Sequence, residues 1–262
     1  MQHGALRNAY LEALGIDRWV PRNTPEVLNE PAQAPLAEAP SRAAAAPAAH
    51  SSAMQAPAAQ ARAPLAPPVP LEPGIDWGPL RERVAACTAC ELCKTRTQTV
   101  FGVGNTRAEW LIIGEAPGAD EDRKGEPFVG RAGQLLNAML LAIGLPRETV
   151  FIANILKCRP PGNRDPKPEE VARCLPFLHA QIALLKPKIM LAVGRIAAQN
   201  LLATDAPLAR LRGKLHSFGA ADTPLVITYH PAYLLRTPAD KRKAWEDLKF
   251  ARATYQKLAD VN

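Results

Sequence analysis

The stretch LIIGEAPGADEDRKGEPFVGRAG, residues 111–133, runs from a short apolar segment directly into a turn rich in acids. Its first residues are large and branched, which favours a strand buried on both faces, as in a parallel sheet. Three neighbouring carboxylates, Asp120, Glu121 and Asp122, follow within a few residues. Taken alone they fit a solvated turn, yet the 262-residue chain has a formal net charge of +7. An acid cluster beside a strand end in a basic protein therefore indicates a candidate functional site.

Strand-like and helix-like segments alternate on both sides of this stretch. Short apolar runs occur at EWLIIG (109–114), VFIANI (150–155), KIMLAVG (188–194) and PLVITYH (224–230). Segments with helical spacing of apolar residues lie between and after them, at 131–144, 168–185 and 238–258. This alternation predicts an α/β fold with about four parallel strands between helical layers.

Polar and glycine-rich residues follow each predicted strand. The strand ends read GEAPGADED, NILKCRPPGN, GRIA and HPAYLLR. Ligands of open parallel sheets bind beyond the carboxyl ends of the strands, so we expect the site there. Gly114 and Gly118 set a tight bend at the first of these ends. The bend lacks both the P-loop and the Gly-x-Gly-x-x-Gly pattern, so it is no phosphate cradle.

Composition divides the chain into three parts. Residues 31–74 contain 10 Pro and 17 Ala with few large apolar residues, which predicts a disordered linker. A short peptide, residues 1–30, precedes the linker. A segment long enough to form a domain, residues 75–262, follows it. Residues 1–74 hold 5 Lys and Arg against 6 Asp and Glu, so the basic excess lies downstream and suits nucleic acid. The sequence has neither a membrane-length apolar run nor a signal-peptide core, so we expect a cytoplasmic protein, monomeric when alone.

Four of the five cysteines are spaced as metal ligands. Cysteines are kept reduced in the cytoplasm, so metal binding or a core position is a better interpretation than disulfides. Spacing alone permits a tetrahedral zinc ion as readily as an iron-sulfur cluster. The residues concerned are Cys87, Cys90, Cys158 and Cys174. The remaining one, Cys93, is expected to be a small core residue, with an alternative role as a further ligand.

Several motifs together carry a family resemblance. GEAPGADED, GEPFVGRAG, NILKCRPP and HPAYLLR, with CTACELCKTRTQTVFGVGN upstream, occur in this order between about residues 80 and 258. This set resembles the family 4 uracil-DNA glycosylases, the iron-sulfur branch of that superfamily. The resemblance implies a three-layer α/β/α sandwich with a four-stranded parallel sheet. It also implies a 4Fe-4S cluster held by Cys87, Cys90, Cys158 and Cys174.

The resemblance implies hydrolysis of the bond between uracil and deoxyribose in DNA. The base must leave the duplex to reach a catalytic pocket. By resemblance, Phe128 stacks on the base, Asn154 pairs with its edge, and His230 donates to O2 as the uracil departs. Glu115 or Glu121 is then expected to stabilise the cationic sugar and to orient the attacking water.

The motifs also depart from the better-known family 1 enzymes. The position of the family 1 catalytic Asp is Ala116 here, and Gly118 stands where those enzymes place the Tyr that excludes thymine. How this chain would reject thymine is therefore open. None of these motif positions is a lysine, so we expect base removal without strand cleavage.

Two segments are predicted to contact DNA, at its phosphate backbone and in its base stack. In HPAYLLR, Tyr233, Leu234 and Leu235 offer an apolar wedge for the space left by the flipped nucleotide, and Arg236 a phosphate contact. The segment RLRGKLH adds a second candidate phosphate-binding loop. Its cations are Arg210, Arg212 and Lys214.

The N-terminal peptide suggests a function of another class. YLEALGIDRWVPR resembles the short N-terminal peptide of the psi subunit of bacterial DNA polymerase III, which docks on the clamp loader. Residues 6–22 have a helix-sized apolar face, but an isolated helix of this length is marginal in water. The alternative to an enzyme is thus a clamp-loader adapter whose second domain binds DNA with little or no activity.

We predict that the 1–30 peptide binds clamp-loader subunits and that Trp19 is a buried anchor of the contact. Calorimetric titration of the peptide measures this, with a Trp19→Ala peptide as the control. Absence of binding, or equal binding by both peptides, would show that the segment is not a docking peptide.

Overall fold

The computed structural model describes residues 74–259. The predicted docking peptide, 1–30, and the predicted linker, apart from Gly74, lie outside the described residues. None of the helices in the described part of the chain is long and apolar enough to span a membrane.

Four parallel strands form the centre of the sheet, as predicted. They are β2 (Trp110–Gly114), β3 (Phe151–Asn154), β4 (Ile189–Val193) and β6 (Thr223–Thr228), in the spatial order β3-β2-β4-β6. Every residue of β2, β3 and β4 is buried, which accounts for their uninterrupted apolar sequences. In the parallel register Gly114 lies beside Asn154, so two motif residues meet at the carboxyl ends of β2 and β3.

Two short edge strands extend the sheet to six. β1 (Val103–Gly104) pairs antiparallel with β3, and β5 (His216–Phe218) pairs antiparallel with β6. The sequence prediction of a four-stranded sheet missed them. Strands of two or three residues that are partly exposed contain no apolar run, so hydrophobic patterning cannot detect them.

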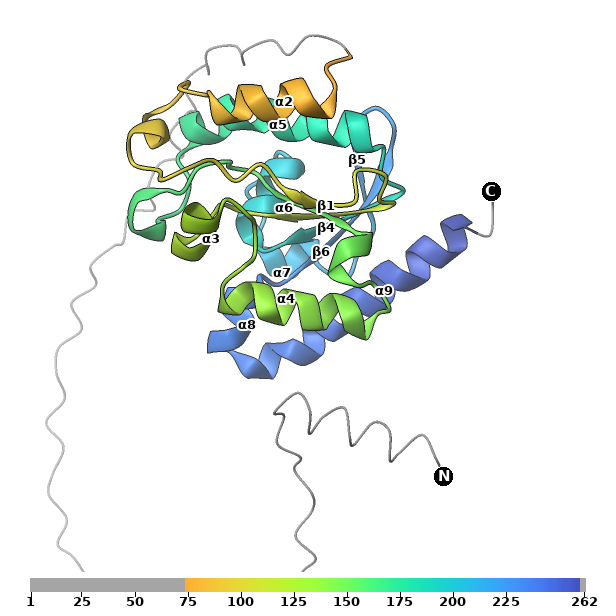
Figure 1. Ribbon diagram of the computed structural model, residues 1–262. Helices are drawn as coiled ribbons and strands as arrows, with labels where there is room; N and C mark the ends of the chain where they lie inside the picture. The colour runs from red at the N-terminus through yellow and green to blue at the C-terminus, as the bar shows by residue number, and fades with distance from the viewer. Residues whose placement is uncertain (1–73, 260–262) are drawn as a thin grey trace, which may run out of the picture. The chain divides into compact units, whose positions relative to one another are not determined.

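Helices cover both faces of the sheet, which gives the predicted α/β/α sandwich (Figure 1). One face packs against α2 (Trp77–Ala85), α5 (Pro168–Leu185), α6 (Arg195–Leu201) and α7 (Leu208–Leu211). The other face packs against α4 (Arg131–Ala142), α8 (Pro231–Arg236) and α9 (Lys241–Ala259). The remaining short elements are α3 (Ala119–Lys124), η1 (Glu91–Lys94), η2 (Arg147–Thr149), η3 (Pro161–Asn163) and η4 (Pro238–Asp240).

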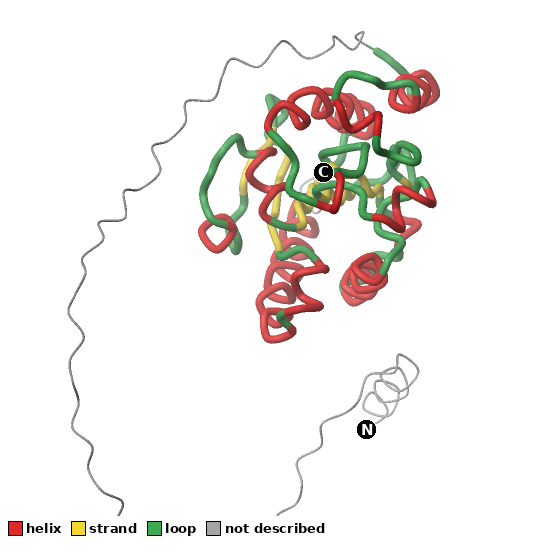
Figure 2. Tube along the Cα trace, turned by 90° about the vertical axis from the view of Figure 1, so that its left-hand side faces the viewer, coloured by secondary structure: helices red, strands yellow, loops and turns green. Residues whose placement is uncertain are grey.

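The strand order creates a site at one end of the sheet. The strands β3 and β4 lie on opposite sides of β2, so the chain leaves β2 toward one neighbour and later returns to the other. Such a reversal opens a crevice at the carboxyl ends of the strands. Figure 2 faces the side on which α3 lies in Figure 1 and shows loops and short helices gathered there.

Candidate functional site

A cleft of about 410 Å³ opens beyond the carboxyl ends of the parallel strands. Residues from the ends of three strands meet there: Glu115 follows β2, Asn154 ends β3, and His230 follows β6. The full lining is Glu115, Ala116, Pro117, Gly118, Glu121, Phe128, Ala132, Asn154, Pro160, Asn163, Arg164, Asp165, His230, Ala232, Tyr233 and Arg236. The cleft therefore lies where the sheet topology predicts a ligand site.

Two residues that line the cleft, Asn154 and Phe128, pack against Gly114 at the end of β2. A Cβ on this residue would lie 2.4 Å from Asn154 Oδ1 and 2.6 Å from Phe128 Cζ. Only glycine therefore allows the amide and the ring to approach the end of β2 together. The predicted substrate-binding residues Gly114, Phe128 and Asn154 form one contiguous surface.

Asn154 presents a buried acceptor that lacks a partner. Its side chain is only 2% exposed, and Oδ1 accepts no hydrogen bond from the described residues. A buried polar atom left without a partner costs about 1–3 kcal/mol. This cost is offset when a ligand brings an N–H donor into the cleft.

Phe128 forms an aromatic wall beside His230. The two ring centroids are 5.6 Å apart and the rings are inclined by 30°. The backbone of Phe128 has φ 55°, in the left-handed region that large L-residues rarely adopt. Such conformations persist only where the surrounding structure enforces them, and they concentrate at functional sites.

His230 is a neutral hydrogen-bond donor at physiological pH. It caps α8, and its Nδ1 accepts a hydrogen bond of 3.1 Å from the backbone N–H of Ala232. The proton of the neutral ring must therefore be on Nε2. Burial lowers the pKa of His230 to about 4, with Arg236 acting in the same direction and Glu121 opposing it.

Glu121 has a positioning role. Its Oε1 accepts hydrogen bonds from the backbone N–H groups of Val129 (2.9 Å) and Gly130 (3.0 Å), while Oε2 accepts one from Gly118 (3.1 Å). The carboxylate thus ties the turn after β2 to the loop that carries Phe128. Glu115 and Glu121 are the two candidates from the sequence for the catalytic acid. Both carboxylate oxygens of Glu121 already accept hydrogen bonds from the backbone.

The rest of the acid cluster is structural as well. Asp122 is 4% exposed and accepts hydrogen bonds from the N–H of Thr97 at 2.9 and 3.1 Å. Asp120 forms an exposed ion pair with Arg123 one turn along α3. Glu121 and Asp122 therefore hold loops together through backbone N–H groups, whereas Asp120 pairs within its own helix.

Glu115 lines the cleft directly after β2, and its carboxyl has a raised pKa. The strand pairing continues past β2 and β3, because the amide of Leu156 donates to the Glu115 carbonyl at 3.0 Å. Burial raises the pKa of the Glu115 carboxyl to about 7, Asp165 raises it further, and Arg195 opposes them. A rigidly held, partly desolvated acid in a cleft is a candidate for catalysis.

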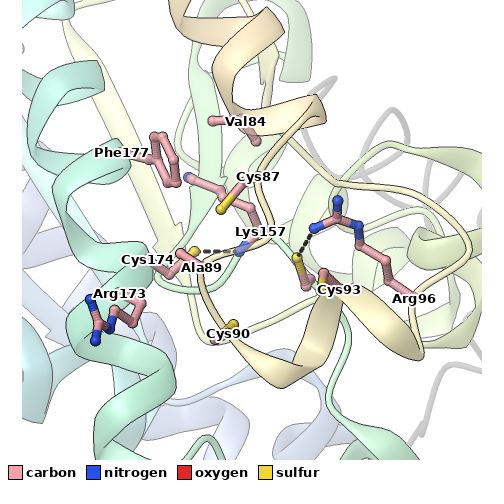
Figure 3. A pocket seen from close by; sticks show the side chains of 11 residues that line it. Val84, Cys87, Ala89, Cys90, Cys93, Arg96, Lys157, Arg173, Cys174 and Phe177 are labelled. Atoms are coloured by element: carbon pink, nitrogen blue, oxygen red, sulfur yellow. Dashed lines mark hydrogen bonds between the residues drawn. The ribbon is translucent and has the colours of Figure 1, made fainter. Parts of the chain in front are cut away.

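All five cysteines line a second pocket, between α2, η1 and α5 (Figure 3). Cys158 and Cys174 are buried, and the other three are half-buried. Arg96 Nη1 donates to Cys158 Sγ at 2.9 Å, and the Lys157 amide donates to Cys174 Sγ at 3.1 Å. Burial raises the pKa of the Cys174 thiol to about 12, although nearby Lys157 opposes this shift.

The cysteine arrangement does not resemble a mononuclear site. Within residues 74–259, no three potential ligands are placed to hold one metal ion. A tetrahedral zinc site needs its sulfurs about 2.3 Å from a single point. Cys93, expected in the core, instead lines this pocket as a fifth cysteine.

Comparison with known proteins identifies the family of the chain. The family model of the uracil DNA glycosylase superfamily matches residues 101–249. The chain belongs to this superfamily. It is 45% identical to a type-4 uracil-DNA glycosylase of Archaeoglobus fulgidus over 172 residues, covering 63% of this chain and 86% of the relative. Type-4 relatives from Pyrobaculum aerophilum (43% over 180 residues, 66% and 92% covered) and Thermotoga maritima (41% over 179 residues, 67% and 93%) are similar.

The predicted wedge residues in α8 divide into a core residue and a surface residue. Leu234 is 1% exposed and packs with α4 and α9, so its prediction as a DNA wedge is wrong. Leu235 is 37% exposed and stays a candidate. The Tyr233 hydroxyl donates to Asp240 Oδ2 at 2.6 Å, and its ring stacks on Tyr229, which holds it at the rim of the cleft.

The predicted phosphate contacts also divide. Arg236 is exposed and lines the cleft, so it stays a candidate for a phosphate contact. Arg212 is instead an internal tie, since Nε donates to Asp247 Oδ2 at 2.8 Å and Nη2 to the Lys243 carbonyl at 2.6 Å. Its prediction as a phosphate contact is therefore wrong, whereas Arg210 and Lys214 beside it are exposed.

Sequence analysis missed one wall of the cleft. Asn163, Arg164 and Asp165 line it from the segment after β3, and Asp165 pairs with Arg195 at 2.6 Å. Their position just beyond NILKCRPPG, at a strand end, is the signal that could have identified them.

We predict opposite effects for the two leucines of α8. Leu234→Ala removes a core side chain and should lower the free energy of unfolding by about 2–5 kcal/mol. Leu235→Ala should leave stability within about 0.5 kcal/mol of wild type and slow uracil release from duplex more than from single-stranded DNA. Urea unfolding and single-turnover assays measure these effects. Equal duplex and single-strand rates for Leu235→Ala and wild type would exclude the wedge.

Proposed function

We propose that this chain hydrolyses the N-glycosidic bond of uracil in DNA, as a monofunctional uracil-DNA glycosylase of base excision repair. The observation that carries the proposal is the meeting of Glu115, Phe128, Asn154 and His230 in one cleft at the strand ends. The activity named for the type-4 relatives and the matching superfamily model support it.

Asn154 is suited to select uracil. Its unpartnered Oδ1 accepts from the N3–H of uracil, and its amide group donates to O4. Cytosine presents the reverse pattern at these two atoms, so it would leave the buried amide oxygen without a donor. Phe128 supplies an apolar face on which the flipped base can stack.

His230 is suited to stabilise the departing base. Cleavage leaves negative charge on the uracil, which gathers partly on O2. The Nε2–H of the neutral ring donates to this oxygen, and the fixed Nδ1 contact keeps the ring oriented. A donor held toward developing charge in a desolvated site typically contributes about 2.7–4 kcal/mol to the rate barrier.

Glu115 is suited to the opposite charge. Loss of the base leaves a cationic sugar, and a carboxylate in the cleft stabilises it and orients a water for attack. Among the described residues that line the cleft there is no lysine to form a Schiff base with the sugar. This agrees with base removal that leaves the DNA strand intact.

The cysteine pocket is suited to a 4Fe-4S cluster held by Cys87, Cys90, Cys158 and Cys174. The shared pocket of these cysteines, the N–H donors to Cys158 and Cys174, and the resemblance to the family 4 enzymes support it. Such a cluster would join the N-terminal arm of the domain to the segment after β3 and to α5. Cys93 lines the same pocket and is not one of the proposed ligands.

We predict that His230→Ala lowers the single-turnover rate on a uracil-containing oligonucleotide by about two to three orders of magnitude. Asn154→Asp should lose the preference for uracil over cytosine, because a carboxylate lacks the N–H donor. Rates equal to wild type in both variants would refute these roles, and a wild-type chain without uracil release would favour the adapter.

The pKa of Glu115 predicts a pH dependence. Since the carboxylate is the active form, the rate should rise with pH through about 7 and then level off. Glu115→Gln should be slow and lack this rise. The folded state keeps the Glu115 proton up to about pH 7, against 4.5 for the ordinary group, so stability falls as pH increases through this window. Glu115→Gln should therefore unfold at a higher temperature than wild type at pH 8, but not at pH 4.

We predict that the purified protein is brown and contains about four iron atoms per chain. Cys158→Ser should lose the colour and lower the melting temperature, whereas Cys93→Ser should keep both. Elemental analysis and visible absorption measure this. A colourless protein with one zinc ion would contradict the cluster.

A further inference from the structure

Arg147 is a half-buried cation that the proposed reaction does not use. It lies in η2, just before β3, and its guanidinium reaches the loop in front of α4. Nη2 donates to the Pro127 carbonyl at 2.6 Å, and Nη1 donates to the Phe128 carbonyl at 3.3 Å and to Asn137 Oδ1 at 3.0 Å. One side chain thus holds two consecutive backbone carbonyls.

The peptide segment that Arg147 holds is the strained one. Phe128 has φ 55°, which its side chain disfavours, so the loop would relax without an external restraint. Gly133 in the first turn of α4 packs so closely that a Cβ there would lie 1.8 Å from the Phe128 oxygen. The Phe128 carbonyl is therefore fixed from two sides, by the Gly133 backbone and by Arg147.

The contacts use the shape of the guanidinium more than its charge. All three acceptors are neutral oxygens, and burial lowers the pKa of Arg147 although Glu126 and Glu121 oppose this. A planar fork reaches these oxygens from two nitrogen atoms at a fixed separation, whereas the lysine ammonium donates from one nitrogen only. The position therefore requires arginine geometry, and lysine should not replace it.

We propose that Arg147 is a positioning residue that clamps Phe128 in its left-handed conformation and so sets the ring against the bound base. This inference rests on the proposed function, because Phe128 matters for the reaction through the base it stacks on. Arg147 lies outside the residues that line the cleft. Its loss should weaken the handling of the flipped base and leave the affinity for DNA without uracil unchanged.

The test compares Arg147→Ala, Arg147→Lys and wild type in single-turnover uracil release. A misplacement of about 1 Å costs roughly 100-fold in rate, so we expect a 10- to 100-fold loss for both variants. Millimolar guanidinium should raise the rate of Arg147→Ala several-fold over its rate without guanidinium. Arg131→Ala, an exposed arginine at the start of α4, is the matched control and should keep the wild-type rate.

A double-mutant cycle with Phe128→Leu separates positioning from general destabilisation. If Arg147 acts through Phe128, the effects of Arg147→Ala and Phe128→Leu should be far from additive. Wild-type rates in folded Arg147→Ala, or a loss that guanidinium does not restore and that adds to Phe128→Leu, would overturn the proposal. Melting temperatures establish that each variant is folded.

Two further outcomes are covered by separate measurements. If Arg147→Ala does not fold, Arg147→Lys and Asn137→Ala, which removes one anchor of the guanidinium, take its place, and wild-type rates in both would overturn the clamp. If wild type releases no uracil, the proposed function fails. The clamp is then judged by calorimetric titration of free uracil, where equal affinity of wild type and Arg147→Lys would overturn it.

Discussion

The site depends on the lack of a side chain at Gly114. The central strand ends at this residue, and the parallel register sets Asn154 beside it on the neighbouring strand. Any side chain at the position would collide with the Asn154 amide and with the Phe128 ring. The close contact of strand end, amide and ring is thus a property of backbone geometry, which the buried sheet makes rigid. The catalytic candidates Glu115 and His230 line the same cleft as Asn154 and Phe128.

Burial shifts the pKa values of His230 and Glu115, two titratable groups that line the cleft, in opposite directions. It favours the neutral form of each, so the pKa of His230 falls to about 4 while that of Glu115 rises to about 7. At neutral pH the imidazole is an uncharged donor, and a substantial part of Glu115 is ionised. One desolvated environment therefore supplies a group for the anionic base and a group for the cationic sugar, as in other hydrolases that separate two pKa values by environment.

The sequence predicts those parts of the molecule whose signal is local. Buried parallel strands appear as apolar runs, and the motif residues at their ends meet because parallel strands end on one side. Contacts between distant segments have no such signal. Glu121 and Glu115 are both acids near one turn, and only the structure shows that Glu121 binds three backbone amides. Leu234 and Leu235 are identical in type, and the rotation of α8 decides which of them is buried. The sequence allows Cys93 to be a core residue or a metal ligand, and only the structure shows that it lines the cysteine pocket.

The segment between Cys158 and Cys174 contains a wall of the cleft, including Asn163 and Asp165. A group that joins these two cysteines closes the segment into a loop and removes conformations from the unfolded chain. Because the unfolded chain would have fewer conformations, such a group would favour the folded form of this wall. The cysteine pocket would in this way stabilise the shape of the cleft through the entropy of the unfolded chain.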